Sequence, residues 1–193
     1  MSQTLSWIAV RGLPPEEVRD RLGIRVIAPG DDLPEATCTA CALPGDWYLI
    51  QFSTAGAVTR HGESIVASGA EVIVGTRDLD AARCSATAWK QAAGSWSVAV
   101  MDGTLRVGGD LPSEIGPTIE QSRDAPDGEV PLAFPFEAAR DVLGYHPDQS
   151  TLPWELAEIL DPAPGPAHMA GAGKFGCFGL AVAAVGVLLA LGQ

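Results

Sequence analysis

The chain has 193 residues, of which 47% are hydrophobic, and its formal net charge is −12. This length and composition can bury one sizeable core, so we expect one globular domain with short appendages. Residues 102–161 contain 13 acidic and 3 basic side chains. Such an acidic region repels phosphate groups, which argues against nucleic-acid binding and against adsorption to anionic lipid.

The first part of the chain predicts a strand, a helix and a second strand. Residues 5–10 are apolar and β-branched, as in a strand. Residues 14–22 open with two prolines and two glutamates and are followed by Gly23, which predicts a short helix with a glycine stop. Residues 24–28 then form a short apolar strand.

The next part combines an irregular segment with the clearest strand of the chain. Residues 29–43 are rich in glycine, aspartate and proline, so we expect them to be irregular. After a turn at 43–46, the run Trp-Tyr-Leu-Ile-Gln-Phe at 47–52 predicts a strand near the centre of a sheet. Residues 60–67 fit a short helix.

Sequential strands with short turns then predict an antiparallel meander. The strands are expected at residues 71–76, 84–89, 96–100 and 105–107. Within the second of them, small apolar residues alternate with polar ones, as in a strand with one buried face. Asp102-Gly103 predicts a tight hairpin before the last strand.

Beyond Gly109 the pattern becomes helical. Ser113 offers a helix cap, residues 134–143 fit a helix that ends at Gly144, and residues 153–160 fit a further helix. Together these elements predict an α+β fold, with a mainly antiparallel sheet and flanking helices over residues 1–160.

The end of the chain predicts a membrane anchor. Residues 161–173 are a linker rich in proline, glycine and alanine, and residues 174–193 are expected to form a single transmembrane helix. The run Phe175–Gly192 has no charged residue, and as a helix it would extend about 27 Å, close to the hydrocarbon thickness of a bilayer. The N-terminus has no secretory signal pattern, so we expect the domain on the cytoplasmic side of the membrane.

Small residues recur along the predicted anchor. A buried helix of a soluble domain is the alternative interpretation of the same run. In a membrane helix, small residues on one face allow close helix packing, so we expect weak homodimerisation through the tail. The residues concerned follow Phe175 and are Gly179, Ala183, Gly186 and Ala190.

Cys38-Thr39-Ala40-Cys41 is the sequence motif with the clearest chemical meaning. Two thiols at this spacing can form a reversible disulfide when a helix N-terminus activates one of them. Here Pro44 and Gly45 follow closely and exclude such a helix. A metal site would need further ligands, for which only the distant Cys84, His61 and His146 are candidates. We therefore predict no metal and no cofactor, and retain a thiol redox enzyme or sensor as the alternative function.

Several segments resemble a family of uncharacterised bacterial proteins. The similarity extends over about residues 5–148 and carries no activity that could be transferred to particular residues. The segments are Ser-Trp-Ile-Ala-Val-Arg-Gly at 6–12, Leu-Pro-Gly-Asp-Trp-Tyr-Leu at 43–49, the hairpin of Trp89 and Trp96, and 136–145.

The sequence thus predicts a non-catalytic, membrane-tethered interaction or regulatory module. The expected partners are the membrane, through the C-terminal helix, and a protein. Most of the tryptophans lie at strand positions and are expected to pack in the core. Trp154 follows a Thr-Leu-Pro segment and is predicted to be an exposed aromatic anchor for a partner.

Overall fold

The computed structural model describes residues 4–29, 38–53, 65, 69–90, 94–123, 130–145 and 152–160. The chain divides into two units, Met1–Pro162 and Ala163–Gln193, and the described residues all belong to the first. No helix among them is long and apolar enough to cross a membrane. The predicted linker and anchor lie outside the described residues, as does the predicted helix at 60–67 except for Ile65.

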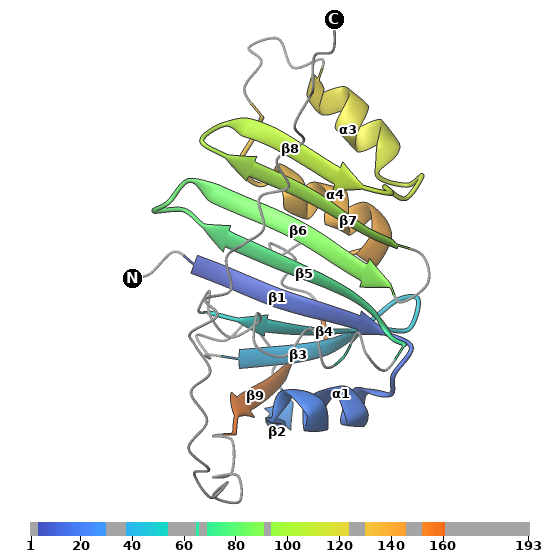
Figure 1. Ribbon diagram of the computed structural model, residues 1–193. Helices are drawn as coiled ribbons and strands as arrows, with labels where there is room; N and C mark the ends of the chain where they lie inside the picture. The colour runs from blue at the N-terminus through green and yellow to red at the C-terminus, as the bar shows by residue number, and fades with distance from the viewer. Residues whose placement is uncertain are drawn as a thin grey trace, which may run out of the picture. The chain divides into compact units, whose positions relative to one another are not determined.

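The described residues form a nine-stranded antiparallel sheet with helices packed against it (Figure 1). The strands are β1 Thr4–Arg11, β2 Ile24–Pro29, β3 Cys38–Leu43, β4 Trp47–Phe52, β5 Glu71–Asp78, β6 Arg83–Lys90, β7 Gly94–Met101, β8 Thr104–Gly109 and β9 Glu155–Ile159. The helices are α1 Pro15–Leu22, α3 Gly116–Arg123 and α4 Phe134–Leu143. The predicted α+β class with a mainly antiparallel sheet is confirmed.

The N-terminal strand lies at the centre of the sheet. The strand order is β2-β9-β3-β4-β1-β5-β6-β7-β8, so β1 is hydrogen-bonded to β4 on one side and to β5 on the other. Five consecutive β1 residues, from Ser6 to Val10, are buried. The predicted strands at 5–10 and 47–52 are therefore confirmed, the second of them near the centre of the sheet as expected, and the structure adds that the two are neighbours.

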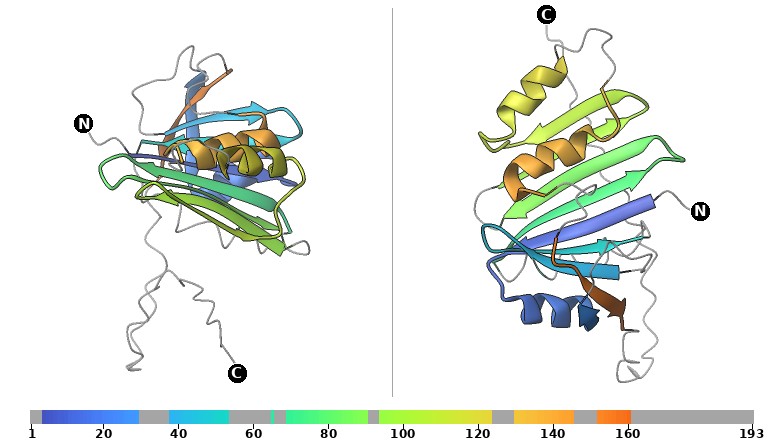
Figure 2. Two further views of the ribbon diagram at one scale, coloured as in Figure 1. Left: turned by 90° about the horizontal axis from the view of Figure 1, so that it is seen from above. Right: turned by 180° about the vertical axis from the view of Figure 1, so that it is seen from behind.

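Two hydrophobic cores lie on opposite faces of the sheet. We call them the α4 face and the α1 face, after the helices that contribute to them. On the α4 face, Ile119 of α3 and Phe136 of α4 pack over strands that include β6 and β7. On the α1 face, Val18 and Leu22 of α1 pack with residues of β1 and β4. Figure 2 shows α3 and α4 together on one face of the sheet.

The helices α1 and α4 begin and end close to the residues predicted for them. The helix α1 ends at Gly23, which has a left-handed φ of 63°. The helix α4 covers the predicted 134–143 and ends at Gly144, with φ of 66°. Both glycines adopt the conformation that favours glycine after a helix.

The predicted meander is confirmed as β5-β6-β7-β8. Each strand is antiparallel to the one before it. Asp102 and Gly103 join β7 to β8 with positive φ values of 51° and 72°, as expected for a two-residue hairpin turn. Cys84, Ala86 and Ala88 of β6 are all buried on the α4 face.

Two predictions of secondary structure are wrong. Residues 38–43, expected to be irregular, form β3, and residues 155–159, expected to be helical, form β9. The segment of β9, Glu-Leu-Ala-Glu-Ile, consists largely of residues that favour helices. It is a strand because β2 and β3 lie on its two sides and hydrogen-bond to its backbone. Tertiary pairing therefore overrides local propensity in this segment.

Candidate functional site

The two cysteines of the Cys-Thr-Ala-Cys motif lie on opposite faces of the sheet. Both belong to β3, in which successive side chains alternate between faces, so residues three apart point in opposite directions. Cys38 contributes to the core on the α1 face and Cys41 to the core on the α4 face. At about 3.3 Å per residue their Cα atoms lie about 10 Å apart, beyond the reach of a disulfide.

The environment of these thiols also disfavours thiolate chemistry. Cys38, Cys41 and Cys84 are free and buried. Burial raises the pKa of each of the three thiols to about 12. The reactive species in thiol chemistry is the thiolate, so these groups stay protonated and unreactive at neutral pH. Among the described residues, no group of three or more His, Cys, Asp or Glu side chains could hold a metal ion.

The α4 face contains a buried aromatic cluster, which consists of Trp7, Phe136, Tyr145 and Trp154. The ring of Trp7 lies 5.6 Å from that of Phe136 and 6.4 Å from that of Tyr145, and Tyr145 meets Trp154 edge-on at 6.0 Å. The Tyr145 hydroxyl donates a hydrogen bond to Oε1 of Gln51 at 2.5 Å. The Nε1 groups of the two tryptophans find no described acceptor, so ring packing holds this cluster together.

The prediction that Trp154 is an exposed anchor is therefore wrong. Its exposed fraction is only 1%. The reason is that β9 enters the sheet between β2 and β3, which directs the residue just before β9 into the core. The other tryptophans follow the prediction of core packing, except that Trp89 on β6 is 37% exposed.

A polar cluster connects α1 to two strands on the α1 face. Nη1 of Arg19 donates a hydrogen bond to the Tyr48 hydroxyl at 3.1 Å, and that hydroxyl donates to Oε2 of Glu155 at 3.2 Å. The hydrogen bond that Arg19 donates to Tyr48 is the main factor that raises the pKa of Arg19. Burial raises the pKa of Tyr48 to about 12. The cluster thus holds α1, β4 and β9 together.

A surface of exposed and half-buried side chains of mixed character lies on β6, β7 and β8. On these strands, the side chains that point away from α4 belong to neither of the two cores. We call this surface the meander face. Its members, placed by strand register, are Arg83, Ser85, Thr87, Trp89, Ser95, Ser97, Ala99, Met101, Thr104 and Arg106.

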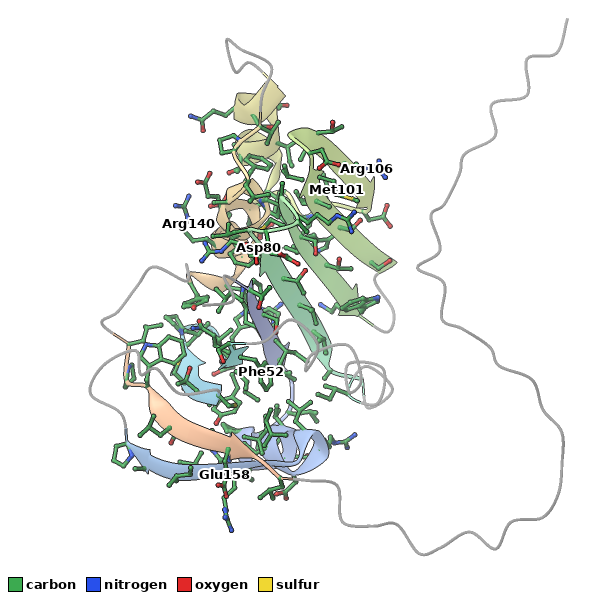
Figure 3. The ribbon with its side chains drawn as sticks, turned by 90° about the vertical axis from the view of Figure 1, so that its left-hand side faces the viewer. Phe52, Asp80, Met101, Arg106, Arg140 and Glu158 are labelled. Atoms are coloured by element: carbon green, nitrogen blue, oxygen red, sulfur yellow. The ribbon has the colours of Figure 1, made fainter. Side chains whose placement is uncertain are left out.

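The meander face contains two exposed arginines without a described ionic partner. Neither Arg83 nor Arg106 forms an ion pair with a described carboxylate. Asp78 is opposite Arg83 in the strand register, but its Oδ1 accepts a hydrogen bond from the backbone of Ala81. Figure 3 shows Arg106 and Met101 on the side of the sheet away from Arg140 of α4.

The meander face was not identified from the sequence, although part of the signal is present there. Residues 84–89 alternate between small apolar and polar side chains, which predicts one buried and one exposed face. Sequence alternation does not say which helix covers the buried face or how far that cover extends. In the structure α4 contacts β5, β6 and β7, whereas α1, on the other face, packs near β2. Comparisons of the chain with protein-family models, with curated proteins and with solved structures find no match.

Proposed function

We propose that this protein is a non-catalytic interaction module, tethered to the cytoplasmic membrane by its C-terminal segment. The observation that carries the proposal is that, among the described residues, α3 and α4 pack on one face of the meander and no described helix packs on the other face of β6 to β8. Strands β6 and β7 bury Ala86, Val98 and Val100 beneath α4. The opposite side chains belong to neither core of the described residues; Arg83, Trp89 and Arg106 are exposed, and Ser85, Thr87, Ser97 and Ala99 between them are half-buried.

The composition of the meander face suits protein recognition. Aromatic residues, methionine and arginine are enriched in the cores of protein interfaces, and tryptophan and arginine dominate their binding energy. Trp89, Met101, Arg83 and Arg106 supply these residue types, and the side chains between them are small. A partner can therefore approach the sheet closely across Ser85, Thr87, Ser97 and Ala99.

The alternative of a thiol enzyme or sensor has less support. It requires Cys38 and Cys41 to form a reversible disulfide, but β3 directs them to opposite faces of the sheet. Oxidation of the pair would require this central part of the sheet to come apart. An interaction module needs no such rearrangement.

The tether is proposed from the sequence of the tail. Phe175–Gly192 is uncharged and of nearly bilayer-spanning length. We expect the full chain to remain in the membrane pellet after carbonate extraction, and a chain that ends at Asp161 to be soluble. Recovery of the full chain in the soluble fraction without detergent would exclude the tether.

The interaction surface can be tested on the full chain in its native membrane. A photo-crosslinking amino acid is placed at Ser97 on the meander face, and in a matched variant at Arg140 on α4, which faces the other way. We expect adducts of one discrete mass from position 97 and none of that mass from position 140. No adduct from position 97, or the same adduct from both positions, would contradict the proposal.

A further inference from the structure

The two edges of the sheet differ in how well they can pair with another strand. At one edge, the register of β2 shifts between Val26 and Ala28, and the strand ends at Pro29, which lacks a backbone donor. Bulges and prolines are common devices that prevent an edge strand from pairing. At the other edge, β8 pairs with β7 without a break from Thr104 to Gly109 and contains no proline.

The regular ladder defines which backbone groups of β8 point outward. In an antiparallel hairpin with a two-residue turn, the residues next to the turn form a hydrogen-bonded pair, and such pairs then alternate along the strands. Thr104, Arg106 and Gly108 therefore bond to β7, in agreement with the next bond of this series, from Asp110 N to Ser95 O at 3.2 Å. The N–H and C=O groups of Leu105 and Val107 point away from the sheet, and no described residue bonds to them.

The side chains of β8 define what could pair there. Arg106 projects from the meander face and has no described ionic partner. Leu105 and Val107 project from the α4 face, where Leu105 packs against the core and Val107 is 38% exposed. A strand added beside β8 would thus meet one positive charge on one face and two apolar side chains on the other.

We infer that the edge of β8 binds an extended segment of a partner protein, with alternating apolar and acidic residues, as an additional antiparallel strand of the sheet. The segment carries a glutamate or aspartate opposite Arg106 and apolar residues on either side of it. The outward groups of Leu105 and Val107 supply its backbone hydrogen bonds, and alternate side chains supply its specificity. The inference rests on the proposed function, for which it specifies the chemistry of the partner.

A competing explanation is that Arg106 only protects the edge, since charged residues on edge strands prevent aggregation. The two explanations differ in a direct observable. Bound segments protect the amides of Leu105 and Val107 from hydrogen exchange, because these N–H groups then donate to the added strand. A merely protective arginine leaves both amides exchanging at the rate of the free protein, whatever peptide is present.

The probe is a short synthetic peptide with an alternating Val-Glu-Val core, added to the full chain in detergent and followed by NMR. We expect the bound peptide to protect the Leu105 and Val107 amides from hydrogen exchange. Binding should be lost when the peptide N–H groups that would donate to β8 are N-methylated. Replacing glutamate by lysine should weaken binding. An Arg106→Gln variant should bind up to about fivefold more weakly, the range of a cross-strand ion pair. The matched Arg140→Gln variant on α4 should bind normally.

Other outcomes would overturn the inference. These are the absence of binding up to about 1 mM, equal binding of the N-methylated peptide, and pairing of β8 with a second copy of the chain. Failure of the peptide together with a retained crosslink from Ser97 would reject the edge site alone. Failure of both experiments would reject the proposed function as well.

Discussion

The contact between Gly75 and Trp7 offers the sharpest test of the packing described above. Gly75 of β5 is directly opposite Trp7 of β1 in the strand register. A Cβ atom added at Gly75 would lie 2.5 Å from Nε1 of Trp7, and closer still to Cε2 and Cζ2. The backbone of Gly75 has no positive φ, so any strand residue could adopt its conformation. Glycine is required there because the indole ring occupies the space of a side chain.

Gly75→Ala should therefore be strongly destabilising. The Trp7 ring has no room to move away, since Phe136 and Tyr145 pack around it at 5.6 and 6.4 Å and its exposed fraction is 1%. Overpacking of a core typically costs about 1–3 kcal/mol, and we expect about 3 kcal/mol here. With a urea m-value of about 2 kcal/mol/M, the unfolding midpoint should fall by about 1.5 M.

The assay is urea unfolding followed by tryptophan fluorescence on the chain that ends at Asp161. Gly116→Ala is the matched control, because nothing lies within 4 Å of a Cβ at this position, and it should change the stability by less than about 1 kcal/mol. Trp7→Phe removes part of the clashing ring. Combined with Gly75→Ala, it should cost less than the sum of the two single changes. A midpoint for Gly75→Ala equal to that of the control would refute the reasoning.

Further predictions concern the thiols, the alkaline range and the tail. Cys38 and Cys41 should resist alkylation in the folded chain at pH 8 and react fully in urea, which mass spectrometry can follow; rapid reaction of the native thiols would show that the two cores open. Burial raises the pKa of these thiols from 9.0, and that of Tyr48 from 10.0, to about 12. The unfolded chain therefore loses these protons first, and urea midpoints should decrease as the pH rises from about 9 to about 12; a constant midpoint would contradict this. In the tail, Gly179→Ile with Gly186→Ile should abolish self-association in a membrane-based assay while insertion is retained, and an unchanged signal would show that the small residues are accidental.

Elements with strong local signals were predictable from the sequence. The helix α4 was located to the residue because a proline lies in its first turn and Gly144 ends it. The hairpin at Asp102-Gly103 was equally clear, since few dipeptides adopt two successive positive φ values. In these segments the physical cause lies within a few neighbouring residues, so the sequence contains it in full.

The candidate sites depended on contacts that are distant in the sequence. The spacing of Cys38 and Cys41 is that of a possible thiol pair. In the sheet, β3 lies between β4 and β9, and side-chain alternation along β3 directs the two thiols to opposite faces. Trp154 was predicted to be exposed, but it is buried because β9, which begins at the next residue, belongs to the same sheet.

By itself, the sequence determined the antiparallel meander, the two glycine-stopped helices and an uncharged C-terminal run, because periodicity, turn residues and composition act locally. Only the tertiary structure decided that β1 lies at the centre, that α3 and α4 pack on one face of the sheet, and that β8 is a regular edge strand among the described residues. The physical reason is that side-chain alternation specifies two faces of every strand. Which face of a strand is buried, and whether its edge is paired, depends on which distant segment packs against that face or edge.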